Sequence, residues 1–395
     1  VLGETSGKNA LVITPSADID LAVADLVSSA FGHAGQKCSA ASLGILVGSI
    51  ADSPRFRRQL LDAVSSIAVG WPDDLGTRMG PVIEPPSDKL RRALTTLEPG
   101  ETWLVEPRQL DEIGRLWSPG VKDGVRPGSF FHLTEVFGPV LGLMRADSLD
   151  EAIELQNATD FGLTGGLHSL DEGEIAHWTE AVAVGNAYVN RHITGAIVRR
   201  QSFGGWKASS IGPGAKAGGP NYVAQLGTWS AAGLPTKGAP VASAVRATVD
   251  AQLATLGSSV GDDERAWLEA ALASDAAAWA DEFGVEHDES ALVVESNVFR
   301  YRPHPRVHVR AGDGTRVVEL VRLVAAATLT GAHVVVSAAP GLDLPSSIGH
   351  VQVVREDDAA FVARAGRSAD VRVRAIGAVA PSLVDALVAV QFPHA

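Results

Sequence analysis

Cys38 is the only cysteine among 395 residues, and it stands in the segment "HAGQKCSAAS", which covers residues 33–42. A single cysteine cannot form an internal disulfide, a cysteine-based zinc site or a CxxC pair. Two interpretations remain open, a buried structural thiol and a nucleophile. The neighbours favour a nucleophile: Gly35 permits a close backbone approach to a ligand, and Lys37 is a positive charge that would lower the thiol pKa. The small residues Ser39, Ala40 and Ala41 also suggest the start of a helix, whose N-terminus would stabilise a thiolate.

Two carboxylates stand in motifs that could complement this thiol. Glu4 precedes a Ser-Gly turn in "GETSGKN", residues 3–9. Glu135 and Phe137 lie two residues apart in "EVFGPV", so they share one face of an extended segment. A carboxylate beside a thiol can act as a general base. Each motif is weak alone, because a single glutamate in a turn is usually only a solvated carboxylate.

The three motifs stand beside expected elements that alternate strand and helix. Ser16 is the candidate N-cap of the first helix, and Ser148 with Glu151 predicts a capping box at a later one. Apolar spacing predicts strands at 10–14, 42–48, 136–146, 162–169 and 185–191, and helices at 16–31, 53–70, 88–97, 148–159 and 174–185. This rhythm predicts an α/β fold with a largely parallel sheet.

A change of composition divides the chain. Ala, Gly, Ser and Pro dominate at 228–245, which we interpret as a linker between residues 1–227 and a second, smaller α/β domain at 246–395. The second domain has expected helices at 242–257, 262–284 and 315–331 and expected strands at 306–311, 333–339, 350–356 and 371–377. Its turns "AGDGT" and "AIGAVAPS" are not full GxGxxG motifs.

His304, His308 and Asp313 lack a recurring ligand spacing, so we interpret them as part of a surface loop and expect no metal site. A content of 46% hydrophobic and 20% charged residues is typical of a soluble globular protein. The net charge of −13 argues against a nucleic-acid partner, which requires a basic surface. No apolar run resembles a transmembrane segment or a signal peptide. We therefore expect a cytoplasmic protein with a small-molecule substrate.

The motifs "ETSGK", "GQKC" and "EVFGP", in this order, resemble the aldehyde dehydrogenase superfamily from Val1 to about Tyr222. The resemblance implies the catalytic half of an aldehyde dehydrogenase fold, followed by the second, Rossmann-like α/β domain. It also implies an NAD-dependent enzyme in which Cys38 is the nucleophile and Glu4 the general base. In the same family pattern, Glu135 and Phe137 bind the nicotinamide half of the cofactor.

Three longer segments are similar to a narrower family. "SAFGHAGQKCSA", "GNAYVNRHITGAIVRRQSFGG" and "AKAGGPNY" resemble the L-glutamate γ-semialdehyde (Δ1-pyrroline-5-carboxylate) dehydrogenases, above all the dehydrogenase module of the proline utilization A (PutA) flavoproteins. This implies oxidation of L-glutamate γ-semialdehyde to L-glutamate in proline catabolism. The implied substrate-binding residues are Lys37, Ser39, Gly195, Ala196 and Phe203. A homo-oligomer is also expected.

The resemblance also raises expectations about the whole polypeptide. In the superfamily the main cofactor-binding half precedes the Glu-x-x-Gly-Lys segment, so we expect upstream sequence to be needed for activity. FAD would belong to a proline dehydrogenase module further upstream. The tail resembles the extra C-terminal domain of longer PutA proteins, and we expect it to be a structural lid or assembly domain.

Two alternatives stay open. One is an aldehyde dehydrogenase for some other small acidic aldehyde, because "VRRQSFGG" places Arg199 and Arg200 near the expected pocket and Ser202 where the family commonly has Pro. The other alternative is an inactive, truncated scaffold that only mediates contacts between chains. The presence of Cys38, Glu4, Glu135 and Phe137 argues against a scaffold, which needs no reactive thiol.

Overall fold

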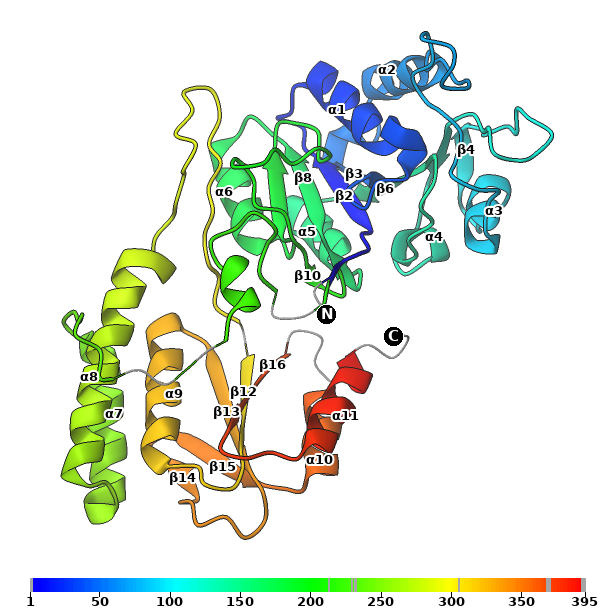
Figure 1. Cartoon of the computed structure of the whole chain (residues 1–395). Helices are drawn as coiled ribbons and strands as arrows, with labels where there is room; N and C mark the ends of the chain where they lie inside the picture. Colours follow the sequence, from blue (N-terminus) through cyan, green and yellow to red (C-terminus); the bar gives the residue numbers. More distant parts are fainter. Residues whose placement is uncertain are drawn as a thin grey trace. The chain divides into compact units, whose positions relative to one another are not determined.

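The computed structural model describes residues 3–211, 214–228, 230, 233–304, 306–366 and 371–391. The chain forms two compact units, Val1–Gly227 and Thr228–Ala395, and each contains its own hydrophobic core (Figure 1). Within the described ranges, no helix is both long and apolar enough to cross a lipid bilayer.

The first unit centres on a seven-stranded sheet with the order β4-β5-β6-β3-β2-β8-β9. The strands are β2 (Asn9–Ile13), β3 (Ala41–Val47), β4 (Thr102–Val105), β5 (Gly120–Asp123), β6 (Val140–Ala146), β8 (Thr164–His168) and β9 (Asn186–Val189). Neighbouring strands are parallel except for β4 and β5, which are antiparallel. The predicted α/β fold with a largely parallel sheet is confirmed.

Helices cover both faces of this sheet. They are α1 (Ile19–Phe31), α2 (Pro54–Ser65), α3 (Asp88–Thr95), α4 (Phe130–Leu133), α5 (Leu149–Asn157) and α6 (Glu172–Ala181). The crossover from β2 to β3 and the crossover from β6 to β8 run in opposite directions along the sheet. Because such crossovers are right-handed, α1 and α5 lie on opposite faces. Helix α1 packs with α2, and α5 packs with α6.

The helix caps follow local hydrogen bonding. Asp18, not Ser16, caps α1, because its carboxylate accepts from the N–H groups of the first turn, and the predicted cap was wrong. The Ser16 hydroxyl instead donates to Glu174 at 2.6 Å. Ser148 caps α5 as predicted, with its Oγ accepting from the Glu151 N–H at 3.2 Å.

Two short antiparallel pairs connect the start of the first unit with its end. Strand β1 (Gly3–Glu4) pairs with β11 (Ser210–Ile211), and β7 (Phe161–Gly162) pairs with β10 (Trp206–Lys207). Single turns of 3-10 helix form η1 (Gly32–Gly35), η2 (Gly48–Ile50) and η3 (Val223–Leu226). The pairing of β1 with β11 places Glu4 opposite Ser210, about two hundred residues later in the chain.

The second unit has a five-stranded sheet with the order β14-β15-β13-β12-β16. Its strands are β12 (Arg306–Ala311), β13 (His333–Ala338), β14 (Ser347–Ile348), β15 (Val351–Arg355) and β16 (Val371–Ile376). Its helices are α7 (Ser243–Leu256), η4 (Gly257–Ser259), α8 (Asp262–Ala278), the π-helical turn η5 (Trp279–Phe283), α9 (Val317–Thr330), α10 (Asp358–Ala365) and α11 (Pro381–Gln391). Helices α7 to α9 cover one face, and α10 and α11 cover the other (Figure 1).

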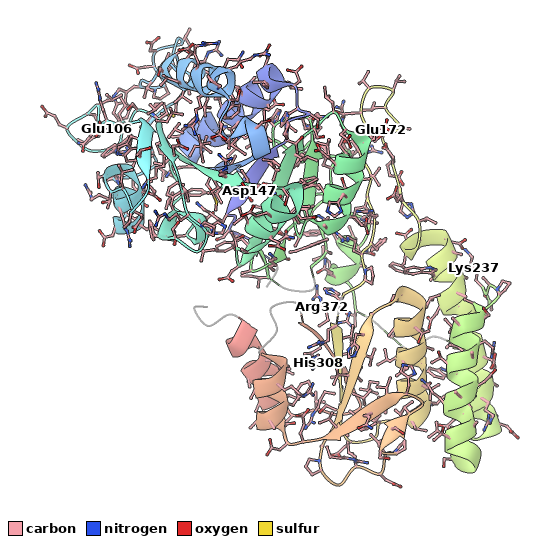
Figure 2. The ribbon with its side chains drawn as sticks, turned by 180° about the vertical axis from the view of Figure 1, so that it is seen from behind. Glu106, Asp147, Glu172, Lys237, His308 and Arg372 are labelled. Atoms are coloured by element: carbon pink, nitrogen blue, oxygen red, sulfur yellow. The ribbon has the colours of Figure 1, made fainter. Side chains whose placement is uncertain are left out.

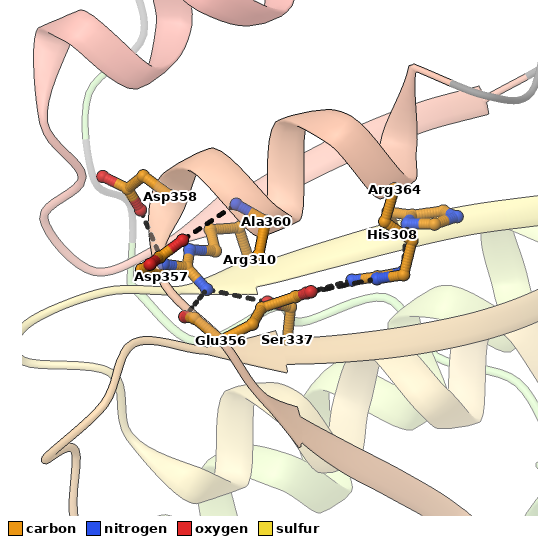
Figure 3. Close-up of polar contacts among 8 residues, drawn as sticks. All are labelled: His308, Arg310, Ser337, Glu356, Asp357, Asp358, Ala360 and Arg364. Atoms are coloured by element: carbon orange, nitrogen blue, oxygen red, sulfur yellow. Dashed lines mark hydrogen bonds and ion pairs between the residues drawn. The ribbon is translucent and has the colours of Figure 1, made fainter.

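A buried polar network fastens α10 to this sheet. Arg310 on β12 donates to Ser337 Oγ at 2.7 Å and to the Glu356 carbonyl at 3.0 Å, and it forms an ion pair with Asp358 (Figure 3). Arg364 on α10 bonds to Glu356. A buried arginine needs such a full set of partners, because an unpaired buried charge is costly.

His308 is part of this network and not of a surface loop, so that interpretation was wrong. Its side chain is 3% exposed on β12, and its Nδ1 lies 2.8 Å from the Arg364 guanidinium (Figures 2 and 3). Burial and then the neighbouring Arg364 lower the pKa of His308 to about 4. Within the ranges that the structure describes, no group of three His, Cys, Asp or Glu side chains could hold a metal ion.

The buried ion pair between Lys122 and Glu101 gives a stability prediction for the first unit. The two side chains are 2% and 1% exposed, and Nζ lies 2.9 Å from Oε2. We expect Lys122→Met to lower the free energy of unfolding by about 3–5 kcal/mol, because it leaves the Glu101 carboxylate buried without its cation. Lys122→Met combined with Glu101→Leu should recover most of this loss, as measured by denaturant unfolding.

The matched control is Arg55→Met, which breaks the exposed ion pair with Asp20. Its loss should be much smaller, because exposed ion pairs contribute little. Equal losses in Lys122→Met and Arg55→Met would contradict a structural role for the buried pair.

Candidate active site

Three of the segments singled out in the sequence lie at the same end of the strands of the first sheet. Cys38 precedes β3, the segment Gly7–Asn9 leads into β2, and Glu135–Gly138 precedes β6. Because β2, β3 and β6 are parallel, the residues before each strand lie at the same edge, which we call the amino edge. Open parallel sheets commonly bind ligands at the carboxyl edge, so this site lies at the opposite end of the strands.

Asn9 fixes the backbone of the cysteine segment. Its Nδ2 donates to the carbonyl oxygens of Cys38 at 2.8 Å and of Ala40 at 2.9 Å. Its Oδ1 accepts from the Thr164 N–H at 3.1 Å, so one buried amide joins the starts of β2, β3 and β8. Cys38 itself is half-buried, in a turn between η1 and β3.

The helix expected to begin at Ser39 does not form. Ala41–Val47 is strand β3, paired in parallel with β2 on one side and β6 on the other. The apolar run is buried on both faces of the sheet, which overrides its weak helical signal. The predicted stabilisation of the thiolate by a helix beginning at Ser39 was therefore wrong.

Two glycines allow the cysteine and glutamate segments to meet. Gly35 has φ of +68°, and a Cβ there would lie 2.2 Å from the Gly138 carbonyl oxygen. Gly35 thus permits a close approach to protein backbone, whereas we had expected an approach to a ligand. A Cβ on Gly7 would lie 2.5 Å from the Cys38 carbonyl oxygen, and the Gly7 N–H donates to Glu135 Oε1 at 3.0 Å.

Burial raises the pKa of the Cys38 thiol above its ordinary value. Hydrogen bonds from the N–H groups of Ser39 and Cys38 lower it, and the carboxylates of Glu135 and Glu4 raise it. The expected lowering of the thiol pKa was wrong, because burial outweighs the groups that favour the thiolate. Both carboxylates nevertheless lie close enough to Cys38 to act on the thiol electrostatically.

Residues near the C-terminal end of the first unit hold the Glu4 carboxylate. Its Oε2 accepts from the Gly205 N–H at 2.6 Å, and its Oε1 accepts from Ser210 Oγ at 3.3 Å. Burial raises the pKa of Glu4, while these hydrogen bonds and the charge of Lys216 lower it. A carboxylate with a raised pKa is suited to accept a proton from water near neutral pH.

Lys37, Glu135 and Phe137 line one pocket at the amino edge, together with Gly7 and other small residues. Phe137 is 37% exposed and has φ of +56°, a left-handed conformation that is uncommon for phenylalanine. Gln36 supports it, because its Nε2 donates to the Phe137 carbonyl at 3.2 Å. A half-buried carboxylate beside an exposed aromatic ring has the chemistry to hold a ribose hydroxyl and a flat base.

The other predicted substrate residues lie in several segments. Ser39 is buried, and its carbonyl accepts from Thr164 Oγ1 at 3.2 Å. Gly195, with φ of +81°, and Ala196 lie in the loop after β9, and within the described residues neither forms a hydrogen bond with the cysteine segment. Phe203 is half-buried and exchanges two backbone hydrogen bonds with Ala217, at 3.0 and 2.8 Å.

Asn9, Lys8 and Lys216 are site residues that the sequence interpretation missed. Lys8 is 3% exposed, its Nζ lies 4.2 Å from the centre of the Phe131 ring, and burial lowers its pKa to about 7. Lys216 acts on Glu4 electrostatically. All three stand in quoted motifs, but a polar residue beside a strand gives no signal of where its side chain points.

The first unit is similar to known enzymes. A family model described as "Aldehyde dehydrogenase family" matches residues 1–228. The 1-pyrroline-5-carboxylate dehydrogenases of Geobacillus sp. (strain WCH70) and Bacillus subtilis (strain 168) are 37% and 36% identical to this chain over 226 residues. Each match covers 56% of this chain and 43% of the relative, so the chain spans less than half the length of these curated relatives.

One solved structure extends the similarity to the second unit. The structure of Proline Utilization A (PutA) from Corynebacterium freiburgense matches with a TM-score of 0.77 and 48% identity, over 98% of this chain and 38% of that chain. A 1-pyrroline-5-carboxylate dehydrogenase from Thermus with bound NAD matches with a TM-score of 0.51 and 36% identity, over 56% of this chain and 42% of that chain.

The electrostatics of Cys38 give a prediction for thiol reactivity. Removing a negative charge beside the thiol favours the thiolate and lowers its pKa, so alkylation near neutral pH should become faster. We therefore expect Glu135→Gln and Glu4→Gln each to accelerate modification by iodoacetamide, with the larger effect from Glu135→Gln. Because the chain has one cysteine, intact-mass measurement reports Cys38 alone.

Asp20→Asn is the matched control, because Asp20 lies on α1 in an exposed ion pair with Arg55. It should leave the alkylation rate and its pH midpoint unchanged. A midpoint that fails to fall in both glutamate variants would remove these carboxylates from the surroundings of the thiol.

Proposed function

This chain belongs to the aldehyde dehydrogenase family, and from that premise we propose that it acts in the NAD-dependent oxidation of L-glutamate γ-semialdehyde to L-glutamate in proline catabolism. The first unit would supply the catalytic residues. The observation that carries this proposal is the meeting of the Cys38 and Glu135 segments at the amino edge, where a Cβ on Gly7 would lie 2.5 Å from the Cys38 carbonyl oxygen and the Gly7 N–H donates to Glu135 Oε1 at 3.0 Å. Glu4, on β1, acts electrostatically on the same thiol. The relatives named 1-pyrroline-5-carboxylate dehydrogenase support the choice of this aldehyde.

In the proposed first step, the Cys38 thiolate adds to the aldehyde carbon, so that a C–S bond forms and the carbonyl electron pair moves to oxygen. The Cys38 N–H is one proposed donor to this oxyanion. Asn9 supports the step, because it holds the Cys38 carbonyl and so fixes the direction of the adjacent backbone. When bound, NAD⁺ supplies the acceptor for the hydride whose loss leaves a thioester on Cys38.

In the proposed second step, Glu4 removes a proton from water, and the resulting hydroxide attacks the thioester carbon. The C–S bond breaks, the acid leaves and the Cys38 thiolate is restored. Glu4 suits this role, because it is half-buried, has a raised pKa and is oriented by the Gly205 N–H.

Glu135 and Phe137 are the residues proposed to hold NAD. One oxygen of Glu135 accepts from Gly7, and the remaining lone pairs of the carboxylate can accept ribose hydroxyls. The exposed face of Phe137 can pack beside the nicotinamide ring. The bound NAD named for the Thermus relative supports this cofactor.

Lys37 is the proposed partner of the substrate carboxylate, with N–H groups at Gly195 and Ala196 adding hydrogen bonds. Lys37 supports this role by lining the same pocket as Glu135 and Phe137. Ser39 and Phe203 would complete the pocket, with Phe203 covering the aliphatic part of the substrate. An ammonium group paired with a carboxylate gives a strong, charge-assisted contact.

A different small acidic aldehyde remains the second candidate for the substrate. Arg199 and Arg200 are both exposed in the loop after β9, and Arg199 has φ of +67°. If these two arginines reach the substrate, their positive charges would favour an aldehyde with more negative charge. Comparing turnover of mono- and dicarboxylic aldehydes decides between the two candidates.

The wider expectations remain predictions. The second unit is proposed to be structural, a lid or an assembly domain, and its similarity to part of the PutA structure from C. freiburgense supports a shared architecture. A homo-oligomer, FAD in an upstream proline dehydrogenase module, and a cytoplasmic location are untested. Light scattering in solution and flavin absorbance of the natural polypeptide test the first two.

Glu4→Gln tests the two-step chemistry. The amide still accepts a hydrogen bond from Gly205 but cannot take a proton from water, so acylation should persist and hydrolysis should slow by about 100-fold or more. Rapid-quench measurement should show a burst of NADH followed by a slow steady state, and intact mass should show the acylated protein. In Cys38→Ser both phases should vanish. An unchanged steady-state rate without trapped thioester would remove Glu4 from the base role.

Lys37→Met tests recognition of the acidic aldehyde. Loss of a charge-assisted contact should raise KM for glutamate γ-semialdehyde by about tenfold or more. The control is a neutral aldehyde of similar length on the same variant, for which KM should change little. Equal increases of KM for both aldehydes would contradict the proposed role of Lys37 in binding the carboxylate. They would not contradict the roles proposed for Cys38 and Glu4.

A further inference from the structure

Lys216 acts electrostatically on Glu4, the proposed base, and has no role in the steps described above. Its Nζ donates to the Gly204 carbonyl at 2.8 Å, to the Gly185 carbonyl and to Asn186 Oδ1 at 3.3 Å. The residue is half-buried, but these three oxygens enclose its ammonium group. A lysine held in this way is expensive to desolvate, and its partners here are neutral oxygens.

The peptide that Lys216 holds is the one next to the base. Asn186 Oδ1 accepts from the Gly204 N–H at 3.1 Å, and Lys216 binds the Gly204 carbonyl. Gly204 is therefore fixed on both sides. The following N–H, that of Gly205, donates to Glu4 Oε2 at 2.6 Å. A Cβ at Gly204 would lie 2.9 Å from Glu4 Oε1 and 3.0 Å from Lys216 Cγ, so a larger residue there would displace the Glu4 carboxylate or the Lys216 side chain.

We propose that Lys216 is a positioning residue for thioester hydrolysis, because it holds the Gly204–Gly205 peptide in the orientation that directs the Glu4 carboxylate. This rests on the proposed function only in taking Glu4 as the hydrolytic base. Lys216 acts through Gly205 and Glu4 and touches neither the aldehyde nor the cofactor.

The charge of Lys216 adds to its geometric role. Burial raises the pKa of Glu4, whereas the Lys216 cation lowers it, so Lys216 keeps more of the base ionised at neutral pH. Burial lowers the pKa of Lys216 to about 8, and Glu4 is the charge that opposes this shift. Cys38 is the other titratable group on which Glu4 acts, and Glu135 faces the same thiol.

The same segment also reaches the proposed substrate cover. Ala217, the residue after Lys216, pairs with Phe203 through two backbone hydrogen bonds. A purely structural role for Lys216 would therefore disturb Phe203 and raise KM together with lowering kcat. A positioning role predicts a selective loss in the hydrolysis rate instead.

The test compares Lys216→Met with Lys207→Met. Lys207 is the matched control, because its Nζ also binds two backbone carbonyls, those of Asn157 and Thr159 at 2.7 and 3.0 Å, away from Glu4. Both proteins are prepared as the natural polypeptide, including any residues that precede Val1. p-Nitrophenyl acetate acylates a reactive thiol without NAD, so its burst counts working Cys38 and its steady state reports hydrolysis.

We expect Lys216→Met to keep a burst of about one equivalent and to slow hydrolysis by about tenfold or more. The steady-state KM should not rise, because slower hydrolysis lets the acylated protein accumulate. The acid limb of its hydrolysis profile should move to higher pH, because Glu4 loses the cation that favours its ionised form. Lys216→Arg, which keeps the charge and the donors, should recover part of the rate. Lys207→Met should show none of these changes.

Two results would overturn the proposal. One is hydrolysis in Lys216→Met at the rate of Lys207→Met, with the acid limb unmoved. The other is a loss of burst and an increase of KM that match the loss of rate, which would indicate a structural role. A burst that persists in Cys38→Ser would instead contradict the proposed nucleophile, so the failure of the proposed function is distinguishable from the failure of this inference.

Discussion

The buried carboxamide of Asn9 is the interaction on which the site depends. It binds the Cys38 and Ala40 carbonyls with its NH₂ group and the Thr164 N–H with its oxygen. A buried amide that satisfies three backbone groups is hard to replace, because any smaller or apolar side chain leaves those groups without partners. Because β2, β3 and β8 are parallel, all three strands begin at the amino edge, where the Asn9 amide joins them.

The amino edge also sets the electrostatics of the site. Parallel strands have their first N–H groups and the preceding loops at this edge, and here the loops carry Cys38, Glu135 and Lys8. Glu4 arrives from β1, which belongs to a separate two-stranded pair. The result is a thiol whose pKa burial raises, beside a base whose pKa burial also raises. In both groups, N–H donors oppose the effect of burial by favouring the ionised form.

One turn of the second unit resembles a nucleotide-binding turn but is closed by its own backbone. Its turn "AGDGT" follows β12 and leads to α9, as a nucleotide-binding turn would. Asp313 instead exchanges backbone hydrogen bonds with Ala378, at 3.1 and 2.8 Å, and a Cβ on Gly312 would lie 1.9 Å from the Ala378 carbonyl oxygen. Backbone of the segment after β16 occupies the place where a phosphate would approach such a turn. This closed turn agrees with a structural part for the unit.

The sequence by itself determined the α/β class, most of the strands and helices, and the three motifs that form the site. These follow from local periodicity, capping by residues such as Ser148, and residue types that chemistry requires.

The sequence did not determine what surrounds each motif. No helix begins at Ser39, because β3 starts at Ala41 between β2 and β6, and the thiol pKa is raised because burial dominates. His308 lies inside a sheet because Arg364 and Phe361 cover it. Lys216 reaches Glu4 across more than two hundred residues only because β1 pairs with β11. Such long-range pairing is a property of the folded chain, and local sequence carries no record of it.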